Sequence, residues 1–487
     1  MRTSVRRGTM MIASVLAAAG GARAQEMQMP KQEQHHRMEM PSVKPEYPRM
    51  GRAQENAKGA LVTLEQAQKI ASESNPTLRQ AQAEIRATKA RQQQAGLYPN
   101  PTVAYTGDEI RGGSVGGGKQ GFFVQQTVVT GGKLGLSRGV FGKDVKLAEL
   151  EGEEQKMRVQ SAVKMAFLRV LAAQELLYAR RDMSMIAQDA AETERRLMNT
   201  GQADETEVLE AEVESQRVRM TARMQENTLR EEWRSLAAVI GQPHLPLTTV
   251  GGDLEKGWPE VNEEETVEAI AKESPAVRIA GAAEARAQTV LARAKRESIP
   301  DIQVRGGMEY NNELLGSAPI AKGWEGIAEV ALQIPLFNRN QGNVSAARAD
   351  IDRVGQEKKR IALTLRERAA SAVDQYANAR LMAVEYRDGM LPRAKKAYGL
   401  MVERYGQMLA SYPRVLDAQR KLYELQLEYI AALESVWTNG IALQGYLLTD
   451  GLEAPARPGE MDRPVRETNV PMPERAMSPG ETVKRNP

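Results

Sequence analysis

The chain has 487 residues, a formal net charge of +3 and no cysteine, with 26% charged and 5% aromatic residues. The absence of cysteine excludes a disulfide framework and thiolate metal sites, and the near-neutral charge gives no reason to expect a nucleic-acid partner. A composition dominated by Ala, Glu, Gln, Arg and Leu indicates long helices rather than one broad globular core.

Residues 1–24 have the pattern of a secretory signal peptide. Three arginines within the first seven residues precede a short apolar stretch, and Ala22 and Ala24 are the small residues of a cleavage site. The apolar stretch has about a dozen residues, whereas a membrane-spanning helix needs about 20. Removal of this leader, with its four arginines, changes the formal charge of the remaining chain from +3 to −1.

Residues 25–60 are rich in Pro, Met and Gln and lack hydrophobic periodicity, which predicts a flexible segment. Four methionines in it flank two adjacent histidines: Met27, Met29, Met38, Met40, His35 and His36. Thioether and imidazole ligands together favour Cu(I) and, by analogy, Ag(I). These six residues are therefore a possible metal site, and the alternative is a leader without a ligand role.

Between this segment and a second Pro-rich, charged stretch at 450–487, predicted to be a flexible tail, apolar residues recur at helical spacing. The first such pattern follows the capping-box sequence Thr63-Leu64-Glu65-Gln66. The predicted helices cover residues 64–97, 140–198, 204–240, 264–298, 344–390, 392–404 and 413–448. Their charged and Gln-rich exposed faces are typical of antiparallel coiled-coil hairpins.

Two pairs of short segments alternate as strands instead, 102–110 with 121–129 and 301–310 with 324–335. In the last segment the residues of one face are Trp324, Gly326, Ala328, Val330, Leu332 and Ile334. The residues of its other face are Glu325, Glu329 and Gln333. One apolar and one polar face are what a barrel wall between lipid and water requires.

The chain contains an internal duplication. Pro76 and Pro275 lie 199 residues apart, and so do Pro101 and Pro300. The Val-Leu-x-Ala runs that begin at 208 and 415 lie 207 residues apart. Constant offsets at landmark residues predict two repeats, residues 61–248 and 249–449.

Four strands cannot close a barrel, and lipid does not tolerate open sheet edges. Three copies of the chain would supply 12 strands, an even number that can enclose a water-filled lumen. The predicted fold is therefore mixed α+β: a long antiparallel α-helical coiled-coil barrel, and four strands per chain that contribute to a trimeric 12-stranded transmembrane β-barrel.

Three segments of the sequence resemble parts of a known protein family. The segment 333–342 (QIPLFNRNQG) resembles the passage from strand to helix in the TolC-like outer-membrane efflux family. Residues 409–413 (LASYP) are similar to its heavy-metal members, of the copper/silver or cobalt-zinc-cadmium kind. Residues 201–211 and 405–418 resemble the two helix–turn–helix tips of that family, and the resemblance extends over about 61–448. It implies a homotrimer in the outer membrane that docks onto a periplasmic adaptor protein. An inner-membrane pump would supply the energy, because the chain has no nucleotide-binding signature.

The resemblance also implies site residues. Asp417, Glu207 and Tyr405 match positions that constrict the periplasmic aperture, where three-fold symmetry would convert one carboxylate into a ring. The alternative is that these carboxylates are solvated charges on helix surfaces. The predicted adaptor contacts at the two tips are Thr200, Gly201, Gln202, Met408, Leu409, Ala410 and Ser411. Arg414 stands where the family often has an acid and Met408 stands where the first repeat has Gly201, so the second tip is expected to close or dock differently.

The predicted function is a passive exit duct of a tripartite pump, of the resistance-nodulation-division type, that exports metal cations such as copper or silver. The alternatives are a duct for drugs and other small organic molecules, a duct for type I protein secretion, or a non-conducting periplasmic coiled-coil scaffold. We predict no enzymatic activity and no cofactor, because the sequence lacks a nucleophile–base arrangement, an H-E-x-x-H motif and a phosphate-binding loop.

Overall fold

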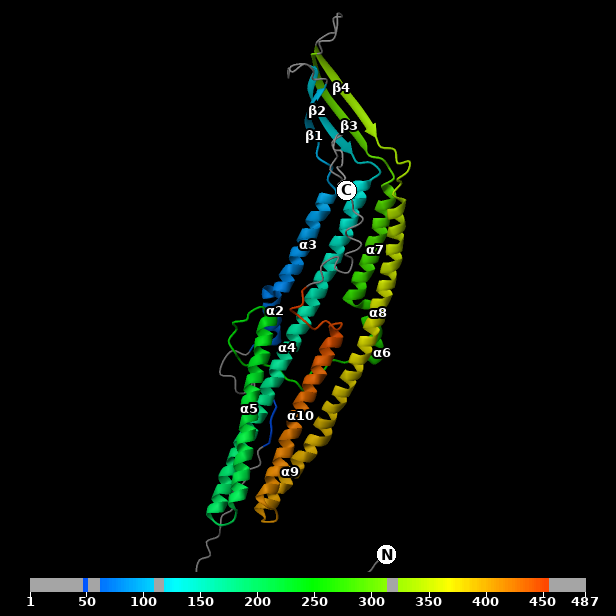
Figure 1. Ribbon diagram of the computed structural model, residues 1–487. Helices are drawn as coiled ribbons and strands as arrows, with labels where there is room; N and C mark the ends of the chain where they lie inside the picture. The colour runs from blue at the N-terminus through cyan, green and yellow to red at the C-terminus, as the bar shows by residue number, and fades with distance from the viewer. Residues whose placement is uncertain (1–46, 51–61, 109–117, 313–322, 455–487) are drawn as a thin grey trace, which may run out of the picture. The chain divides into compact units, whose positions relative to one another are not determined.

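The computed structural model describes residues 47–50, 62–108, 118–312 and 323–454 (Figure 1). The elements of the first half are α2 (Leu64–Ser74), α3 (Pro76–Ala95), β1 (Thr102–Asp108), β2 (Gly118–Val128), α4 (Lys133–Asn199) and α5 (Glu205–Ile240). Those of the second half are α6 (Glu263–Glu273), α7 (Pro275–Arg296), β3 (Ile302–Asn312), β4 (Gly323–Leu332), α8 (Gln341–Val384), the π-helix η1 (Glu385–Met390), α9 (Leu391–Gly406) and α10 (Tyr412–Gln444). The order of two short helices, a strand pair and long helices thus occurs twice.

The predicted capping box at Thr63 is confirmed, because Thr63 and Gln66 each bond the other's backbone N–H. The single helix predicted over 64–97 was wrong, since the chain bends at Asn75 and continues as α3 from Pro76. The helix predicted over 264–298 is likewise two helices that meet at Ser274. In both places a polar N-cap precedes a proline, which has no N–H for the preceding helix to bond.

Two other helix limits also differ from those predicted. α4 begins at Lys133 rather than residue 140, directly after Gly131 and Gly132, which both have positive φ. Two further glycines within its first turns had obscured the apolar pattern. The last helix ends at Gln444 rather than 448, because Tyr446 and Leu447 adopt left-handed backbone angles.

The long helices pack side by side (Figure 1). α4 packs against α5 over their whole hairpin and also against α3, α7 and α10, while α8 packs against α7, α6 and α10. The principal core lies where α2, α4, α5, α8 and α10 meet. Its largest side chains include Trp233, Leu236, Tyr429, Leu433 and Trp437. Among the described residues, no helix combines the length and apolar character needed to cross a membrane.

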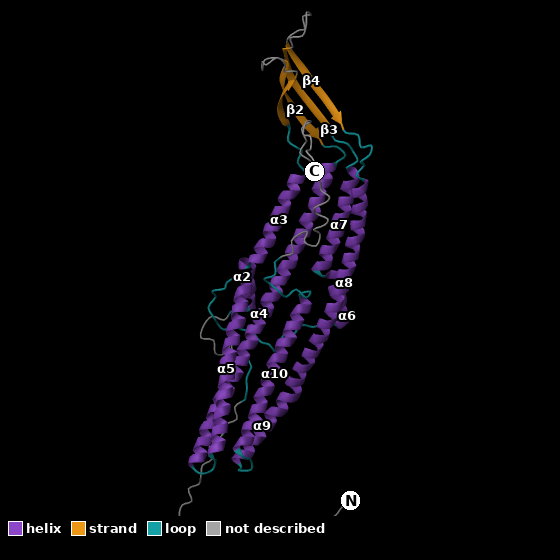
Figure 2. Ribbon diagram, in the orientation of Figure 1, coloured by secondary structure: helices purple, strands orange, loops and turns teal. Residues whose placement is uncertain are grey.

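All four strands form one antiparallel sheet in the order β1-β2-β3-β4 (Figure 2). Pairing of β2 with β3 joins the two predicted hairpins, which lie far apart in the sequence. β4 ends at Leu332, three residues before the predicted limit, because its partner β3 begins at Ile302 just after Pro300. The structure therefore confirms the mixed α+β architecture.

Candidate functional site

The sheet has one apolar face along all four strands. Residues paired directly across an antiparallel ladder share a face, and the register pairs Tyr105 with Phe122, Phe122 with Met308, and Tyr310 with Trp324. The large apolar side chains of this face are 39–72% exposed: Val103, Tyr105, Phe122, Val124, Val128, Val304, Met308, Tyr310, Trp324, Val330 and Leu332. The arrangement predicted for the last strand is confirmed and extends to the other three.

The opposite face of the sheet is mostly polar. Glu309 and Glu325 are directly opposed in the register, and Lys119 Nζ lies 3.9 Å from Glu309 Oε1 and 3.0 Å from Glu325 Oε2. Arg305 Nη1 lies 3.4 Å from Glu329 Oε2, and its guanidinium carbon lies 3.7 Å from the ring centre of Phe123. Since like charges opposite one another destabilise a sheet, Lys119 offsets the repulsion between the two carboxylates.

Each outer strand pairs on one side only within the described chain. β1 pairs with β2 and β4 pairs with β3, so one edge of each outer strand has backbone N–H and C=O groups outside the ladder. Such an edge readily pairs with another strand. The sheet thus has one apolar and one polar face, and within the described chain it has an open edge at β1 and another at β4.

The α4–α5 and α9–α10 turns have the same backbone design. In the first, Gly201 has φ of +73°, and the N–H of Gln202 donates to Leu197 O at 2.8 Å. In the second, Met408 has φ of +57°, and the N–H of Leu409 donates to Arg404 O at 2.8 Å. Both turns are Schellman-type helix ends, so the expected difference at Met408 does not extend to the backbone.

Most residues predicted to contact an adaptor are exposed at these turns. Met408 and Leu409 are 71% and 64% exposed, which leaves two large apolar side chains uncovered. Thr200, Gly201, Gln202 and Ser411 are also exposed, whereas Ala410 is half-buried.

The three residues predicted for the aperture have different surroundings. Tyr405 is buried and packs against Tyr412, with ring centres 5.6 Å apart. Glu207 completes a capping box, because its carboxylate accepts from the Asp204 N–H at 3.0 Å. Asp417 lies 2.8 Å from Lys421 Nζ and 3.0 Å from Arg420 Nη2, and these bases, Lys421 first, lower the pKa of Asp417.

Glu194, near the end of α4, is a further residue of this region that the sequence pattern did not reveal. Its carboxyl is buried, and it influences both Tyr405 and Tyr412 electrostatically. Burial, followed by repulsion from Glu207, raises the pKa of Glu194. The charge of Glu194 in turn contributes, after burial, to the raised pKa of Tyr405, whereas the partners of Asp417 lie on its own helix.

In the described ranges, no three His, Asp or Glu side chains gather in a way that could hold a metal ion. The predicted metal ligands Met27, Met29, Met38, Met40, His35 and His36 lie outside the described residues. His244 is exposed in the loop after α5.

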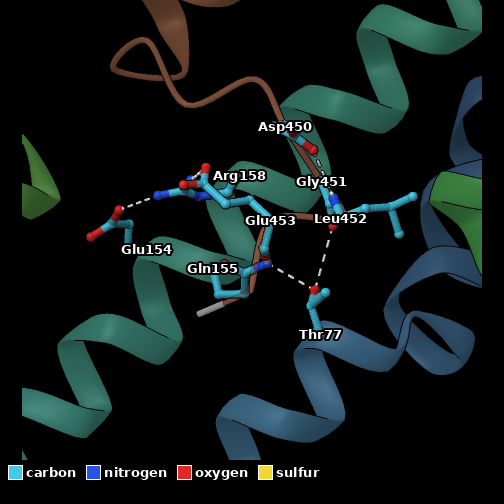
Figure 3. A network of polar contacts seen from close by, with 8 residues as sticks. All are labelled: Thr77, Glu154, Gln155, Arg158, Asp450, Gly451, Leu452 and Glu453. Carbon is cyan, nitrogen blue, oxygen red and sulfur yellow. Dashed lines mark hydrogen bonds and ion pairs between the residues drawn. The ribbon is translucent and has the colours of Figure 1, made fainter. Parts of the chain in front are cut away.

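The segment after α10 docks onto helices of the first half (Figure 3). Gln155 Nε2 donates to Glu453 O at 3.1 Å and to Thr77 Oγ1 at 2.8 Å, and Thr77 Oγ1 donates to Gly451 O at 3.5 Å. Arg158 pairs with both Glu453 and Glu154. We call residues 450–453 the strap; it covers the bend between α2 and α3.

The linker between α5 and α6 makes the reverse contact with helices of the second half. Trp437 Nε1 of α10 donates to Leu254 O at 2.8 Å, and the Tyr429 hydroxyl donates to Glu255 Oε1 at 2.9 Å. The guanidinium of Arg387, in η1, lies 5.3 Å from the ring centre of Trp258. The segment after α10 thus contacts helices of the first half, and the segment after α5 contacts helices of the second half.

The sequence of this chain is similar to those of known proteins. A family model described as outer membrane efflux protein matches residues 53–242 and 267–447. The cobalt-zinc-cadmium resistance protein CzcC of Cupriavidus metallidurans is 24% identical over 392 residues, which cover 80% of this chain and 90% of CzcC.

Two solved structures show the same fold at low sequence identity. CusC, described in connection with transmembrane channel formation, has a TM-score of 0.64 at 16% identity. The superposition covers 84% of this chain and 98% of the CusC chain. The open state of the Neisseria gonorrhoeae MtrE outer membrane channel has a TM-score of 0.63 at 17% identity. The superposition covers 80% of this chain and 89% of the MtrE chain.

Proposed function

This chain belongs to the outer membrane efflux protein family, and from that premise we infer that three copies form the exit duct of a tripartite pump for heavy-metal cations. Membership in the family makes the protein an outer-membrane efflux channel rather than an enzyme. The observation that carries the trimeric duct is the two-faced sheet with two open edges. An apolar outer face suits lipid, a polar inner face suits water, and strand pairing between copies would remove both edges.

Exposed apolar stripes on the helices support the same closure. On α5 the side chains of Leu209, Val213, Met220 and Met224 recur at helical spacing and are 54–66% exposed. They lie on a different side of α5 from Val208, Ser215 and Ala222, which are buried. Leu363 and Leu381 of α8 and Leu400 of α9 are similarly exposed. We assign these stripes to contacts between neighbouring copies, because a ring closed through β1 and β4 would bring adjacent helices together as well.

The hairpin turns are the proposed periplasmic end. Met408 and Leu409 present apolar surface that an adaptor protein would cover, with Thr200, Gly201, Gln202, Ala410 and Ser411 around it. Tyr405, Glu207 and Asp417 remain the proposed aperture residues. Because Lys421 and Arg420 pair with Asp417, a ring of three Asp417 carboxylates would attract cations less strongly than bare acids.

The proposed cargo rests on two separate observations. The relative CzcC is named for resistance to cobalt, zinc and cadmium. The six Met and His residues at 27–40 combine ligands that favour Cu(I) and Ag(I). The shared class is a heavy-metal cation, and the two sources predict different ions.

Metal tolerance of cells that lack this chain tests the proposal. We expect deletion to lower tolerance of copper and silver, or of cobalt, zinc and cadmium, and the wild-type chain to restore it. Unchanged metal tolerance, with loss of drug tolerance or of protein export, would contradict the metal cargo and leave the duct intact. Failure to find heat-modifiable trimers in outer-membrane fractions would contradict the duct itself.

The role of the Met/His segment requires its own comparison. In the same deletion strain, one variant has all six Met and His residues replaced by Gln. The control variant instead has six Gln and Glu residues outside the segment exchanged for one another. A selective loss of copper and silver tolerance with the first chain is the expected result. Equal tolerance with both chains would remove the segment from the metal proposal.

A further inference from the structure

The connector from β4 to α8, residues 333–340, displays apolar side chains beside one open edge of the sheet. Ile334 and Leu336 are each 63% exposed, and Phe337 is 92% exposed. The connector is fixed to the helices, because Asn340 Nδ2 donates to a backbone carbonyl of α7 at 2.8 Å. Apolar side chains gathered on an exposed surface mark an interaction site.

The connector from α3 to β1, residues 96–101, has the same character beside the other open edge. Leu97 is 58% exposed and Tyr98 is 62% exposed. Gln126 Nε2, in β2, donates to Pro99 O at 2.8 Å, which fixes this connector to the sheet. In an antiparallel pair, the end of one strand lies beside the start of the other. Pairing of β4 in one copy with β1 of the next therefore brings the two connectors together.

The chain already contains one junction of this kind, between the connector that follows β2 and the connector that precedes β3. Val128, the last residue of β2, is paired with Ile302, the first residue of β3. Beyond this pair, the N–H of Thr130 donates to Asp301 Oδ1 at 2.8 Å, and Lys133 Nζ lies 2.8 Å from the same oxygen. Since Lys133 is only 3% exposed, buried polar and ionic contacts close this junction within one chain.

We propose that Phe337 of each copy packs against Leu97 and Tyr98 of the next copy, so that an apolar contact closes each junction between chains. This inference rests on the proposed trimeric duct and names residues that join its subunits. Pairing of two like edges, β4 with β4 or β1 with β1, would leave these side chains uncovered, because like strands in an antiparallel pair have their ends apart. The contact therefore favours head-to-tail association, which closes into a ring.

A lipid surface is the alternative occupant of this apolar group. The second copy is favoured by the position of both connectors beside open strand edges. It is also favoured by the junction between β2 and β3, where the corresponding connectors contact each other directly. The two kinds of junction then differ in chemistry, and a buried ion pair cannot be satisfied by an apolar partner. This difference keeps strand pairing within a chain distinct from pairing between chains.

The chain has no cysteine, so an introduced cysteine pair tests the contact directly. A chain with Tyr98→Cys and Phe337→Cys is purified from outer membranes and treated with a short bismaleimide, which bridges two nearby thiols. We expect covalent dimers and trimers that survive boiling, whereas neither single-cysteine chain gives them. The matched control combines Tyr98→Cys with Leu247→Cys, which is expected to give monomer only. Leu247 is 50% exposed and lies in the loop after α5.

Trimer stability gives a second measurement. Phe337→Asp is expected to lower the amount of heat-resistant trimer by about tenfold or more, because an aromatic anchor is lost and a charge enters the contact. Leu247→Asp should leave that amount unchanged. Heat-modifiable trimers that give no crosslink, or that tolerate Phe337→Asp, would overturn the contact and leave Phe337 facing lipid, while the duct would stand. Absence of trimers from the parent chain would contradict the duct itself.

Discussion

Met408 occupies a backbone conformation that favours glycine. It matches Gly201 at the offset of 207 residues, and both positions have positive φ and the same hydrogen-bond pattern. A side chain in the left-handed region costs about 1–2 kcal/mol, which glycine avoids. The protein therefore retains a strained residue at an exposed turn where the side chain itself is proposed to meet a partner.

Met408→Gly is expected to raise the free energy of unfolding by about 1 kcal/mol, because relief of the strain exceeds the entropy that glycine adds to the unfolded chain. Gly201→Ala is the matched control and should lower it by a similar amount. Urea unfolding of both variants gives the comparison. Equal stability of all three chains would show that the left-handed angle at Met408 carries no strain.

Individual residues differed in how well the sequence predicted them. The capping box at Thr63 was predicted because it depends on neighbours three residues apart. Glu194 was not, because α4 is long and packs against five other helices, so its apolar and polar positions do not form one simple stripe. The burial of Tyr405, which packs against Tyr412 of the next helix, likewise depends on packing between helices.

At the scale of elements, each strand was predictable from its alternation, but the pairing of β2 with β3 was not. These strands are separated by 173 residues of helix and loop, from 129 to 301, and nothing local in either one specifies the other. The bends at Asn75 and Ser274 were also not predicted. The proline after each bend indicates a helix start, but the apolar pattern continues across both positions and predicted a single helix.

The two faces of the sheet predict a contrast between adjacent residues of β2. Val124→Lys places a charge on the apolar face and is expected to cost about 2–4 kcal/mol near the bilayer midplane. Gln125→Lys places the same charge on the polar face, directly opposite Arg305, and this like-charge pair is expected to cost less than about 1 kcal/mol. The amount of heat-resistant oligomer in outer-membrane fractions measures both. Equal loss for the two variants would contradict the assigned lipid-facing side.

The strap predicts a second contrast. A Cβ atom at Gly451 would lie 2.7 Å from Ala162 Cβ and 3.1 Å from Val239 Cγ1. Gly451→Ala is therefore expected to lower the free energy of unfolding by about 1–3 kcal/mol through overpacking. Gly281→Ala, in α7 with its nearest neighbour at 4.0 Å, should instead raise it by about 0.5–1 kcal/mol. Chemical denaturation distinguishes the two signs, and a stabilising Gly451→Ala would show that the strap is loosely packed.

At the scale of the whole molecule, the two predicted repeats are tied by polar contacts across α4 and α7. Asp144 Oδ1 accepts from Arg286 Nε at 2.6 Å, and both side chains are less than 10% exposed. Glu153 and Arg278 join the same two helices at 2.9 Å but are about half exposed. The two repeats stay a prediction from constant offsets, and the sequence did not indicate which buried residues would pair between α4 and α7.

Asp144→Asn is expected to lower the free energy of unfolding by about 3–5 kcal/mol, because the Arg286 charge would remain buried without its counter-charge. Glu153→Gln should cost less than about 1 kcal/mol, since water screens the exposed pair. Thermal or urea unfolding of the two variants measures the difference. Similar losses would mean that burial contributes little to the coupling of the repeats.

The strap also has a consequence for biogenesis. Asn75 Nδ2 meets Gly451 O across 376 residues of sequence, so the bend between α2 and α3 cannot be completed until nearly the whole chain has emerged from the export machinery. Contacts of such long range slow folding. A nascent chain would therefore hold its open strand edges in an unfinished subunit, and assembly with other copies would await the arrival of its last helix.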